Sequence, residues 1–171
     1  MRRVLTTASA LILGSTAVAA VTAAGGSAAA RGRTVTFFED GRSGAFVFVD
    51  NRPHSPVPNA DSPKARFSLG DQATFNERLL DHRGGKPVGR VFATETVVAG
   101  SRYPRVTDSI HAIFRFADGQ IIVDTVVDER HPERVHAAVT GGTGAYEGAR
   151  GTFTTKPGRT GNADRIELLP G

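Results

Sequence analysis

The sequence of 171 residues contains no cysteine, and this absence excludes several kinds of chemistry. A chain without cysteine has no disulfide framework, so its domain must be stabilised by an apolar core or by association with other chains. Thiol nucleophiles and thiolate metal sites are excluded as well. The remaining candidates for chemistry are carboxylates, hydroxyls, histidines and basic side chains.

Basic runs and stacking aromatic residues are also scarce. The formal net charge is +4, but the arginines are scattered among acidic residues, and the chain has two tyrosines and no tryptophan. A nucleic-acid interface is expected to show a basic patch, so we expect no nucleic-acid partner. His131 and His136 are separated by a proline and have no third ligand nearby, so we also expect no metal site.

Long apolar runs are missing except at the N-terminus. Two arginines precede an apolar stretch around Leu11–Leu13, and Ala28–Ala30 supplies the small residues of a cleavage site. Gly14 interrupts the stretch, which makes it a poor membrane span. We therefore predict a secretory signal peptide over residues 1–30, a secreted protein, and a single domain over residues 31–171.

The rest of the chain shows alternating apolar and polar residues with turn residues between the segments, and no helical periodicity. This pattern predicts an all-β fold, an antiparallel barrel or sandwich of eight or nine strands. A proline-rich segment over residues 52–66 is expected to be a long loop at a barrel mouth. The predicted strands cover residues 35–38, 45–51, 67–80, 88–99, 107–117, 120–127, 134–140, 151–155 and 165–169.

Five glycines lie within the segment VTGGTGAYEGARGTFTT, residues 139–155. A phosphate-binding P-loop requires a lysine and a following helix, and the dinucleotide motif also opens a helix. The segment lacks the lysine and continues as an alternating strand. We therefore predict a tight turn between strands, with Tyr146 packed over it.

The same segment resembles the G-G-T-G-x-[FY]-x-x-[AV]-x-G signature of the allene oxide cyclase and dirigent families and their secreted bacterial relatives. Residues 68–98, SLGDQATFNERLLDHRGGKPVGRVFATETVV, resemble the upstream G-D-x-x-x-F-x-x-x-L-x-D-x-x-G-x-x-V-G block of these families. The resemblance implies an eight-stranded antiparallel β-barrel, often a homotrimer, which holds a small apolar molecule without a cofactor. A barrel of this size either fills with side chains or encloses one small ligand.

Glu95 is the first candidate for a catalytic residue. In its segment Val91, Ala93, Glu95 and Val97 share one face, and burial among apolar neighbours would raise the pKa of the carboxyl and suit it to acid or base catalysis. The resemblance places this position toward the cavity, with Arg90, Phe92 and Thr94 pointing away. The alternatives are an exposed carboxylate or one paired with an arginine to stabilise the barrel.

Asp50 is the second candidate, because it shares a face with Phe46 and Phe48 and dirigent proteins have an acid in the corresponding strand. The cyclases place their own glutamate about where Val47 stands, so we do not expect allene oxide cyclisation itself. Asp50 also fits the commoner role of a turn aspartate before the proline-rich loop.

Asp128 is the third candidate, because dirigent proteins keep a functional aspartate at about this position. Asp128 shares a face with Asp124 and Val126, and the alternative is an outer face on which the acids pair with Arg130 or Arg134. Glu77, between Phe75 and Leu79 on one face, is a weaker candidate. Several acids in one lumen would be expected to share protons.

Three functions are compatible with these observations. The barrel either directs the cyclisation or stereoselective coupling of a reactive apolar molecule, or carries or sequesters such a molecule without chemistry, or has a filled lumen and a structural or surface-interaction role. Candidate ligand contacts are Phe48, Phe75, Val91 and Tyr146. The residues that would fill the lumen are Phe46, Phe48, Phe75, Phe92 and Phe114.

Overall fold

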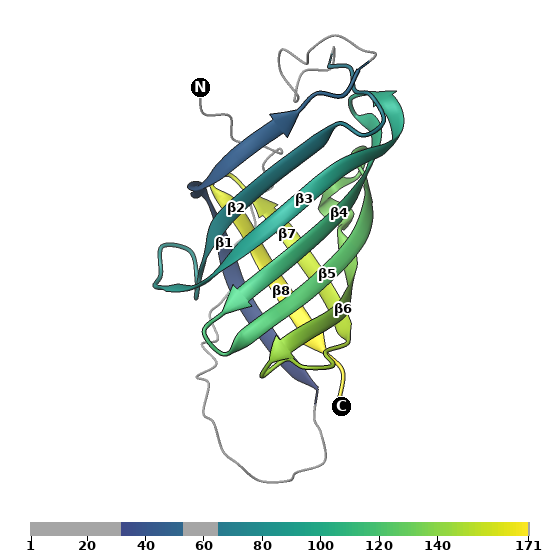
Figure 1. Ribbon diagram of the computed structural model, residues 1–171. Coiled ribbons are helices and arrows are strands. Elements are labelled where there is room, and N and C mark those ends of the chain that lie inside the picture. The colour runs from purple at the N-terminus through teal and green to yellow at the C-terminus, as the bar shows by residue number, and fades with distance from the viewer. Residues whose placement is uncertain (1–31, 53–64, 171) are drawn as a thin grey trace, which may run out of the picture.

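The structure, a computed structural model, describes residues 32–52 and 65–170, and it is a closed antiparallel barrel of eight strands in sequence order (Figure 1). This confirms the predicted all-β, eight-stranded barrel. The predicted signal peptide and most of the proline-rich segment lie outside the described residues. Within the described ranges, no helix is long and apolar enough to cross a membrane. The elements are β1 (Arg33–Val49), β2 (Gln72–Leu80), β3 (Pro87–Arg102), β4 (Arg105–Phe116), β5 (Gly119–Asp128), the 3-10 helix η1 (Pro132–Arg134), β6 (His136–Gly144), β7 (Gly151–Gly158) and β8 (Gly161–Leu168).

Strand β1 joins two segments that the sequence predicts as separate strands. Asp40 lies opposite Arg78 and Ala45 lies opposite Asn76, so the four residues 41–44 face a single residue of β2. The Ser43 hydroxyl holds this bulge, because it donates a hydrogen bond to the Asp40 carbonyl at 2.7 Å and accepts one from the Arg78 amide at 2.8 Å. The three extra residues reverse the inward face of the strand.

One end of the barrel is filled with aromatic side chains. The ring centroid of Phe114 lies 5.1 Å from that of Phe37 and 5.2 Å from that of Phe153, and Phe116 packs against Phe37 at 5.6 Å. Phe114 is 1% exposed, and these rings belong to the main buried cluster. Tilted and edge-on aromatic pairs of this kind add to the stabilisation gained by burial. This end of the barrel is therefore solid core.

The glycine-rich turn between β6 and β7 closes the same end. Gly144 has a φ of +62°, and a Cβ on Gly142 would lie 2.3 Å from the carbonyl oxygen of Tyr146. Tyr146 is buried, and its ring lies 5.8 Å from that of Phe116 and 4.9 Å beneath the guanidinium carbon of Arg33. The predicted turn, with Tyr146 packed over it, is confirmed.

Candidate functional site

The other part of the barrel encloses a cavity of about 690 Å3, a size typical of small-molecule sites. Its walls come from all eight strands and are mainly apolar. Phe46, Phe48, Phe75 and Phe114 line the cavity without filling it, whereas Phe92 is 41% exposed on the outer face. The filled-lumen alternative is therefore wrong for this barrel.

Glu95 lies in this cavity, on the inward face of β3 with Val91, Ala93 and Val97. Burial raises the pKa of its carboxyl to about 8, and the nearby acids Asp108, Glu129 and Glu77 add to the increase. No described residue forms an ion pair with Glu95, and Arg42 is the only basic side chain among the described residues that line the cavity. The Glu95 carboxyl is therefore protonated at neutral pH and can donate a hydrogen bond or a proton into the cavity.

Asp108 and Glu129 form a second acidic group near Glu95. Asp108 of β4 lies opposite Val97 of β3, so it is diagonally across the ladder from Glu95. Burial raises the pKa of Asp108 to about 6, and a hydrogen bond with Glu129 lowers this pKa. Two carboxyl groups can share a hydrogen bond only when one of them holds a proton. This pair can therefore take up or release a proton close to neutral pH.

Sequence reasoning missed both members of this pair, although a signal was present. Asp108 alternates with Val106 and Ile110 along β4, which is the same pattern that identified Glu95. Glu129 directly follows Asp128, whose side chain points the other way. The backbone amide of Glu129 donates a hydrogen bond to the Val106 carbonyl at 3.1 Å, which places Glu129 against β4.

A third acidic group lies deeper in the wall, where Glu39 of β1 meets Asp164 of β8. Burial and the neighbouring Asp164 raise the pKa of Glu39 well above its ordinary value, although Asn162 donates a hydrogen bond to it at 3.0 Å. Burial raises the pKa of Asp164 to about 7, and the nearby Thr155 and Glu39 side chains oppose this increase. Within the described part of the chain, neither carboxyl oxygen of Asp164 has a hydrogen-bond partner with good geometry. Burial and mutual repulsion therefore favour a proton on the Glu39–Asp164 pair.

Glu77, the weaker sequence candidate, also lines the cavity. Burial, and then the nearby Asp40, raise the pKa of its carboxyl. It lies opposite Val91 on β3, directly across from the β1 bulge. Acids from β1, β2, β3, β4 and the residue that follows β5 thus line one apolar lumen.

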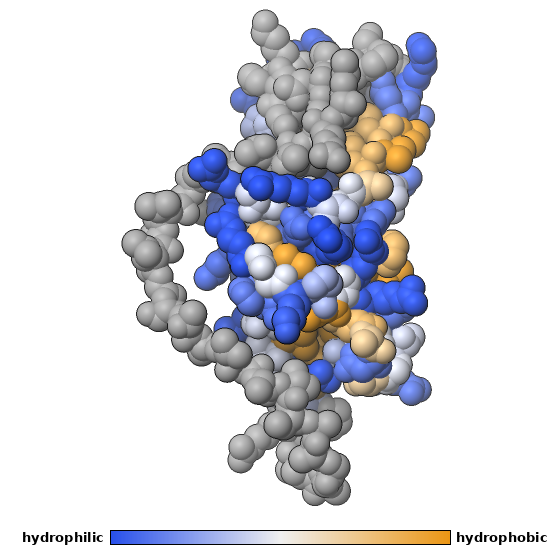
Figure 2. Space-filling view, turned by 90° about the vertical axis from the view of Figure 1, so that its left-hand side faces the viewer, coloured by the Kyte–Doolittle hydropathy of each residue, from blue (hydrophilic) through white to orange (hydrophobic). Residues whose placement is uncertain are grey.

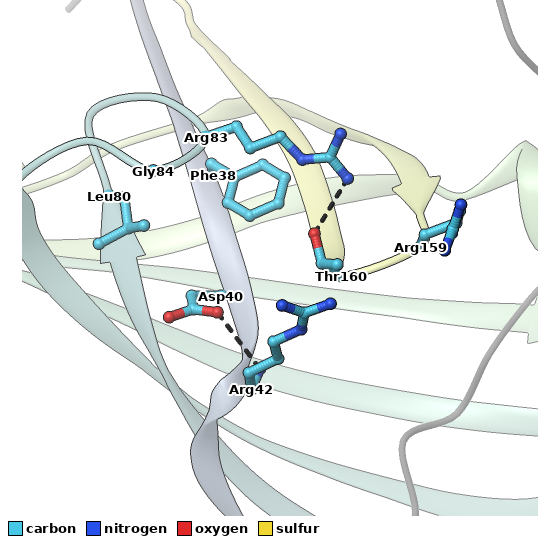
Figure 3. A pocket seen from close by; sticks show the side chains of 8 residues that line it. All are labelled: Phe38, Asp40, Arg42, Leu80, Arg83, Gly84, Arg159 and Thr160. Carbon is cyan, nitrogen blue, oxygen red and sulfur yellow. Dashed lines mark hydrogen bonds between the residues drawn. The ribbon is translucent and has the colours of Figure 1, made fainter.

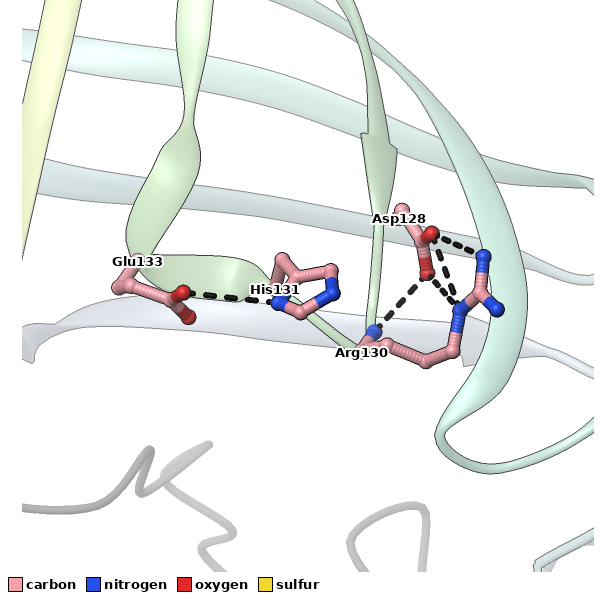
Figure 4. A network of polar contacts seen from close by, with 4 residues as sticks. All are labelled: Asp128, Arg130, His131 and Glu133. Carbon is pink, nitrogen blue, oxygen red and sulfur yellow. Dashed lines mark hydrogen bonds and ion pairs between the residues drawn. The ribbon is translucent and has the colours of Figure 1, made fainter.

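Asp128 lies on the outer face of the barrel and does not line the cavity. Its carboxylate accepts hydrogen bonds from the Arg130 side-chain Nε at 2.9 Å and from the Arg130 backbone amide at 3.0 Å (Figure 4). These bonds lower the pKa of Asp128 to about 2. The inward residues here are Val127 and Glu129. The face that Asp128 shares with Val126 is therefore the outer face. Asp128 pairs there with Arg130, as the alternative to a role in the lumen predicts.

Asp50 also lies outside the cavity lining, one residue beyond the end of β1. Its neighbour Asn51 donates a backbone hydrogen bond to Asp71 at 2.7 Å, which turns the chain away from the strand. This placement fits a residue at a strand end. Of the proposed ligand contacts, Phe48, Phe75 and Val91 line the cavity, whereas Tyr146 is packed in the filled end.

In the part of the chain that the structure describes, no group of three or more histidine, aspartate and glutamate side chains is placed to hold a metal ion. The histidine contacts there are with single acids: His111 Nδ1 lies 2.7 Å from Asp124 Oδ1, and His131 Nδ1 lies 3.6 Å from Glu133 Oε1 (Figure 4). Neither His131 nor Glu133 lines the cavity, so this pair is separate from the acidic groups of the lumen.

The fold and the cavity define a class of protein: a closed eight-stranded antiparallel barrel with an acidic site in an apolar lumen. No protein-family model matches the sequence, and no curated protein is similar to it in sequence. Several solved structures are similar in fold, at sequence identities of 20% or less. Pyocyanin demethylase superposes with a TM-score of 0.60 at 18% identity, over 80% of this chain and 100% of that chain.

Two further structures give a similar result. A pterocarpan synthase dirigent protein has a TM-score of 0.59 at 20% identity, over 82% of this chain and 96% of its own. AbnU, an exo-specific intermolecular Diels-Alderase, has a TM-score of 0.56 at 15% identity, over 81% of this chain and 98% of its own. The chain therefore has the barrel fold of dirigent proteins and Diels-Alderases, as the resemblance in its sequence implies.

Proposed function

We propose that this protein is exported, binds a small and largely apolar molecule in the barrel cavity, and directs its cyclisation or stereoselective coupling. The observation that carries the proposal is Glu95, a carboxyl with a pKa of about 8 in an apolar cavity of about 690 Å3. Strongly shifted acids in a concave apolar site are typical of acid and base catalysis. Barrels of this fold include proteins described as a Diels-Alderase and as a pterocarpan synthase dirigent protein, which supports the reaction class.

The cavity offers two contributions to such a reaction. Its apolar walls restrict a flexible ligand to a conformer in which the reacting atoms are close together. The protonated Glu95 donates a hydrogen bond or proton to an oxygen that gains negative charge, and the Asp108–Glu129 pair accepts a proton that the ligand releases. The product of a cyclisation is an isomer of its substrate, so one proton supplied and one withdrawn balance the reaction.

A carrier without catalytic activity is the second candidate, because a cavity with protonated acids and apolar walls also retains an apolar molecule. Both candidates require that the cavity binds such a molecule. They differ in whether Glu95 is needed for anything beyond binding, because function depends on the site and not on the fold.

Binding in the cavity is tested with the fluorescent probe N-phenyl-1-naphthylamine, which is apolar and uncharged. Ala93 faces Phe75 and Ala112 across the ladders, so Ala93→Phe places a ring in the cavity. We expect this change to weaken probe binding by about tenfold or more, because it removes ligand volume from a preformed site. Ala138→Phe, on the exposed face of β6, is the matched control and should bind as the wild type does. Equal affinity in all three proteins would place the probe outside the cavity and contradict the proposal.

We also propose that the protein is an oligomer, with three chains as implied by the resemblance. Large apolar residues are exposed on the outer surface, among them Val126 at 63% and Val47 at 60%. On the face shown in Figure 2, hydrophobic patches lie among hydrophilic side chains. Burying such patches against other copies stabilises a small barrel that has no disulfide. Light scattering should give about three times the mass of one chain, and the mass of a single chain at micromolar concentration would contradict this.

A further inference from the structure

A second hollow, of about 480 Å3, lies on the outside of the barrel wall (Figure 3). Three segments form it: the β1 bulge, the hairpin between β2 and β3, and the turn between β7 and β8. We call it the arginine pocket, because three of its lining side chains are arginines. The lining residues are Phe38, Asp40, Arg42, Leu80, Arg83, Gly84, Arg159 and Thr160.

The arginine pocket has an excess of positive charge. Its one acid, Asp40, pairs with Arg78 outside the pocket, with Nη2 and Oδ2 3.3 Å apart. Among the described residues, the guanidinium groups of Arg42 and Arg159 have no ion pair, and both side chains are exposed. Guanidinium groups present several donors in a fixed plane and bind carboxylates, sulfonates and phosphates through paired hydrogen bonds. The pocket therefore has free donors for an anion.

Arg83 is held in position at the edge of the pocket. Its Nη2 donates a hydrogen bond to the Thr160 hydroxyl at 2.9 Å, as Figure 3 shows, and its guanidinium carbon lies 5.7 Å above the ring of Phe38. These contacts use one donor and leave the others available. A fixed arginine loses less conformational freedom when it binds an anion.

The arginine pocket and the cavity lie side by side in the barrel wall. Arg42 lines both of them, and the same bulge and turn contribute Gly41, Gly44 and Gly161 to the cavity. The backbones of the two strands are in close contact here: a Cβ on Gly161 would lie 1.7 Å from the Glu39 carbonyl oxygen. The Gly41 amide donates a hydrogen bond to the Thr160 carbonyl at 3.1 Å, which ties the bulge to the turn. The two hollows therefore meet at Arg42.

We propose that the arginine pocket binds the anionic group of the ligand whose apolar part occupies the cavity. The inference rests on the proposed function and narrows its substrate class to amphipathic acids. The apolar lumen, whose adjacent wall holds Glu39 and Glu77 but, among the described residues, no arginine besides Arg42, disfavours a buried anion, whereas the arginines outside stabilise one. This difference fixes the direction in which the ligand lies, with its anionic end outward.

The test compares two probes that share one ring system. 1-Anilinonaphthalene-8-sulfonate carries an anionic group, and N-phenyl-1-naphthylamine lacks it. We expect the double change Arg83→Gln and Arg159→Gln to weaken binding of the sulfonate probe by about tenfold, because it removes two charge-assisted contacts. Binding of the uncharged probe should stay within about twofold, since neither arginine lines the cavity. The control, Arg105→Gln with Arg115→Gln, removes two exposed arginines of β4 outside the pocket and should leave both affinities unchanged.

Inorganic phosphate distinguishes a tethered anionic group from a separate anion. If the pocket holds the sulfonate, phosphate should compete with the sulfonate probe but not with the uncharged probe, and the double variant should lose this competition. If phosphate binds without affecting the sulfonate probe, or if the double variant binds both probes as the wild type does, the inference is wrong while the cavity proposal stands. If the wild type binds neither probe, the proposed function itself fails.

Discussion

Glu95→Gln is expected to raise the free energy of unfolding at pH 8.5 and to leave it nearly unchanged at pH 4. The structural reason is that the pKa of Glu95 is raised from 4.5 to about 8 by burial in the cavity and by neighbouring acids. An acid with a raised pKa stabilises the fold fully below its unfolded pKa, and this contribution is lost as the pH rises through its folded pKa. Glutamine does not ionise, so it avoids this loss.

The expected gain at pH 8.5 is about 2 kcal/mol, which is less than the full shift would give because water reaches the cavity. Chemical denaturation at the two pH values measures it. Glu147→Gln is the control, because Glu147 is exposed in the turn between β6 and β7 and its replacement should have little effect at either pH. Carbon-13 NMR of the carboxyl groups should show a glutamate signal that titrates near pH 8 in the wild type and is absent from the Glu95→Gln variant.

The same variant distinguishes a catalytic protein from a carrier that only binds its ligand. Glu95→Gln should bind the uncharged naphthylamine probe as the wild type does, yet lose turnover of any substrate by at least about a hundredfold, in line with the contribution of a general acid. A variant that loses several kcal/mol of stability at both pH values would instead make Glu95 part of a structural ion pair. A variant that binds and turns over substrate normally would remove Glu95 from the mechanism.

Phe114→Ala is expected to produce the largest loss of stability, about 3 to 4 kcal/mol, because it leaves a void in a close-packed aromatic cluster. Phe114 is 1% exposed and packs against Phe37 and Phe153 where the cavity meets the filled end. Phe92→Ala is the matched control on the adjacent strand. Phe92 is 41% exposed on the outer face, so its loss should cost about 1 kcal/mol or less. Urea denaturation of both variants provides the measurement.

Similar losses of stability in the two variants would contradict the placement of Phe114 inside the barrel and of Phe92 on its outer face. A larger loss at Phe92 would show that this residue is buried, as it would be in an interface between chains. In that case the cost should depend on protein concentration, because the stability of an oligomer includes its association.

The sequence predicted an all-β fold because alternation along a half-buried strand depends on local residue pattern alone. The alternation also put Glu95 on one face with Val91, and the resemblance to the cyclase and dirigent families supplied both the eight-stranded barrel and the inward direction of that face. The same pattern could not say which face of β5 is inward, because both faces contain acids and valines: Asp128 shares the outer face with Val126, and Glu129 follows Val127 inward. Tyr146 was correctly placed over its turn, but the end of the barrel at which the turn lies depends on contacts between distant strands.

The acidic pairs were beyond sequence reasoning for a different reason. Glu39 and Asp164 are more than a hundred residues apart and meet only because β1 and β8 close the barrel. Asp108 and Glu129 meet because β5 ends beside the start of β4. The arginine pocket likewise combines a bulge, a hairpin and a turn that no local motif connects.

The bulge in β1 limits how this strand can change in length. Because four residues stand opposite one, Glu39 faces inward on one side of the bulge, and Phe46 and Phe48 line the cavity on the other side. The pairing of Phe46 with Phe75 fixes the inward face beyond the bulge. A deletion between Asp40 and Ala45 that shifted this pairing by one residue would turn Val47 and Val49 inward and both phenylalanines outward. Changes of length at this position therefore preserve the cavity only where the bulge absorbs them.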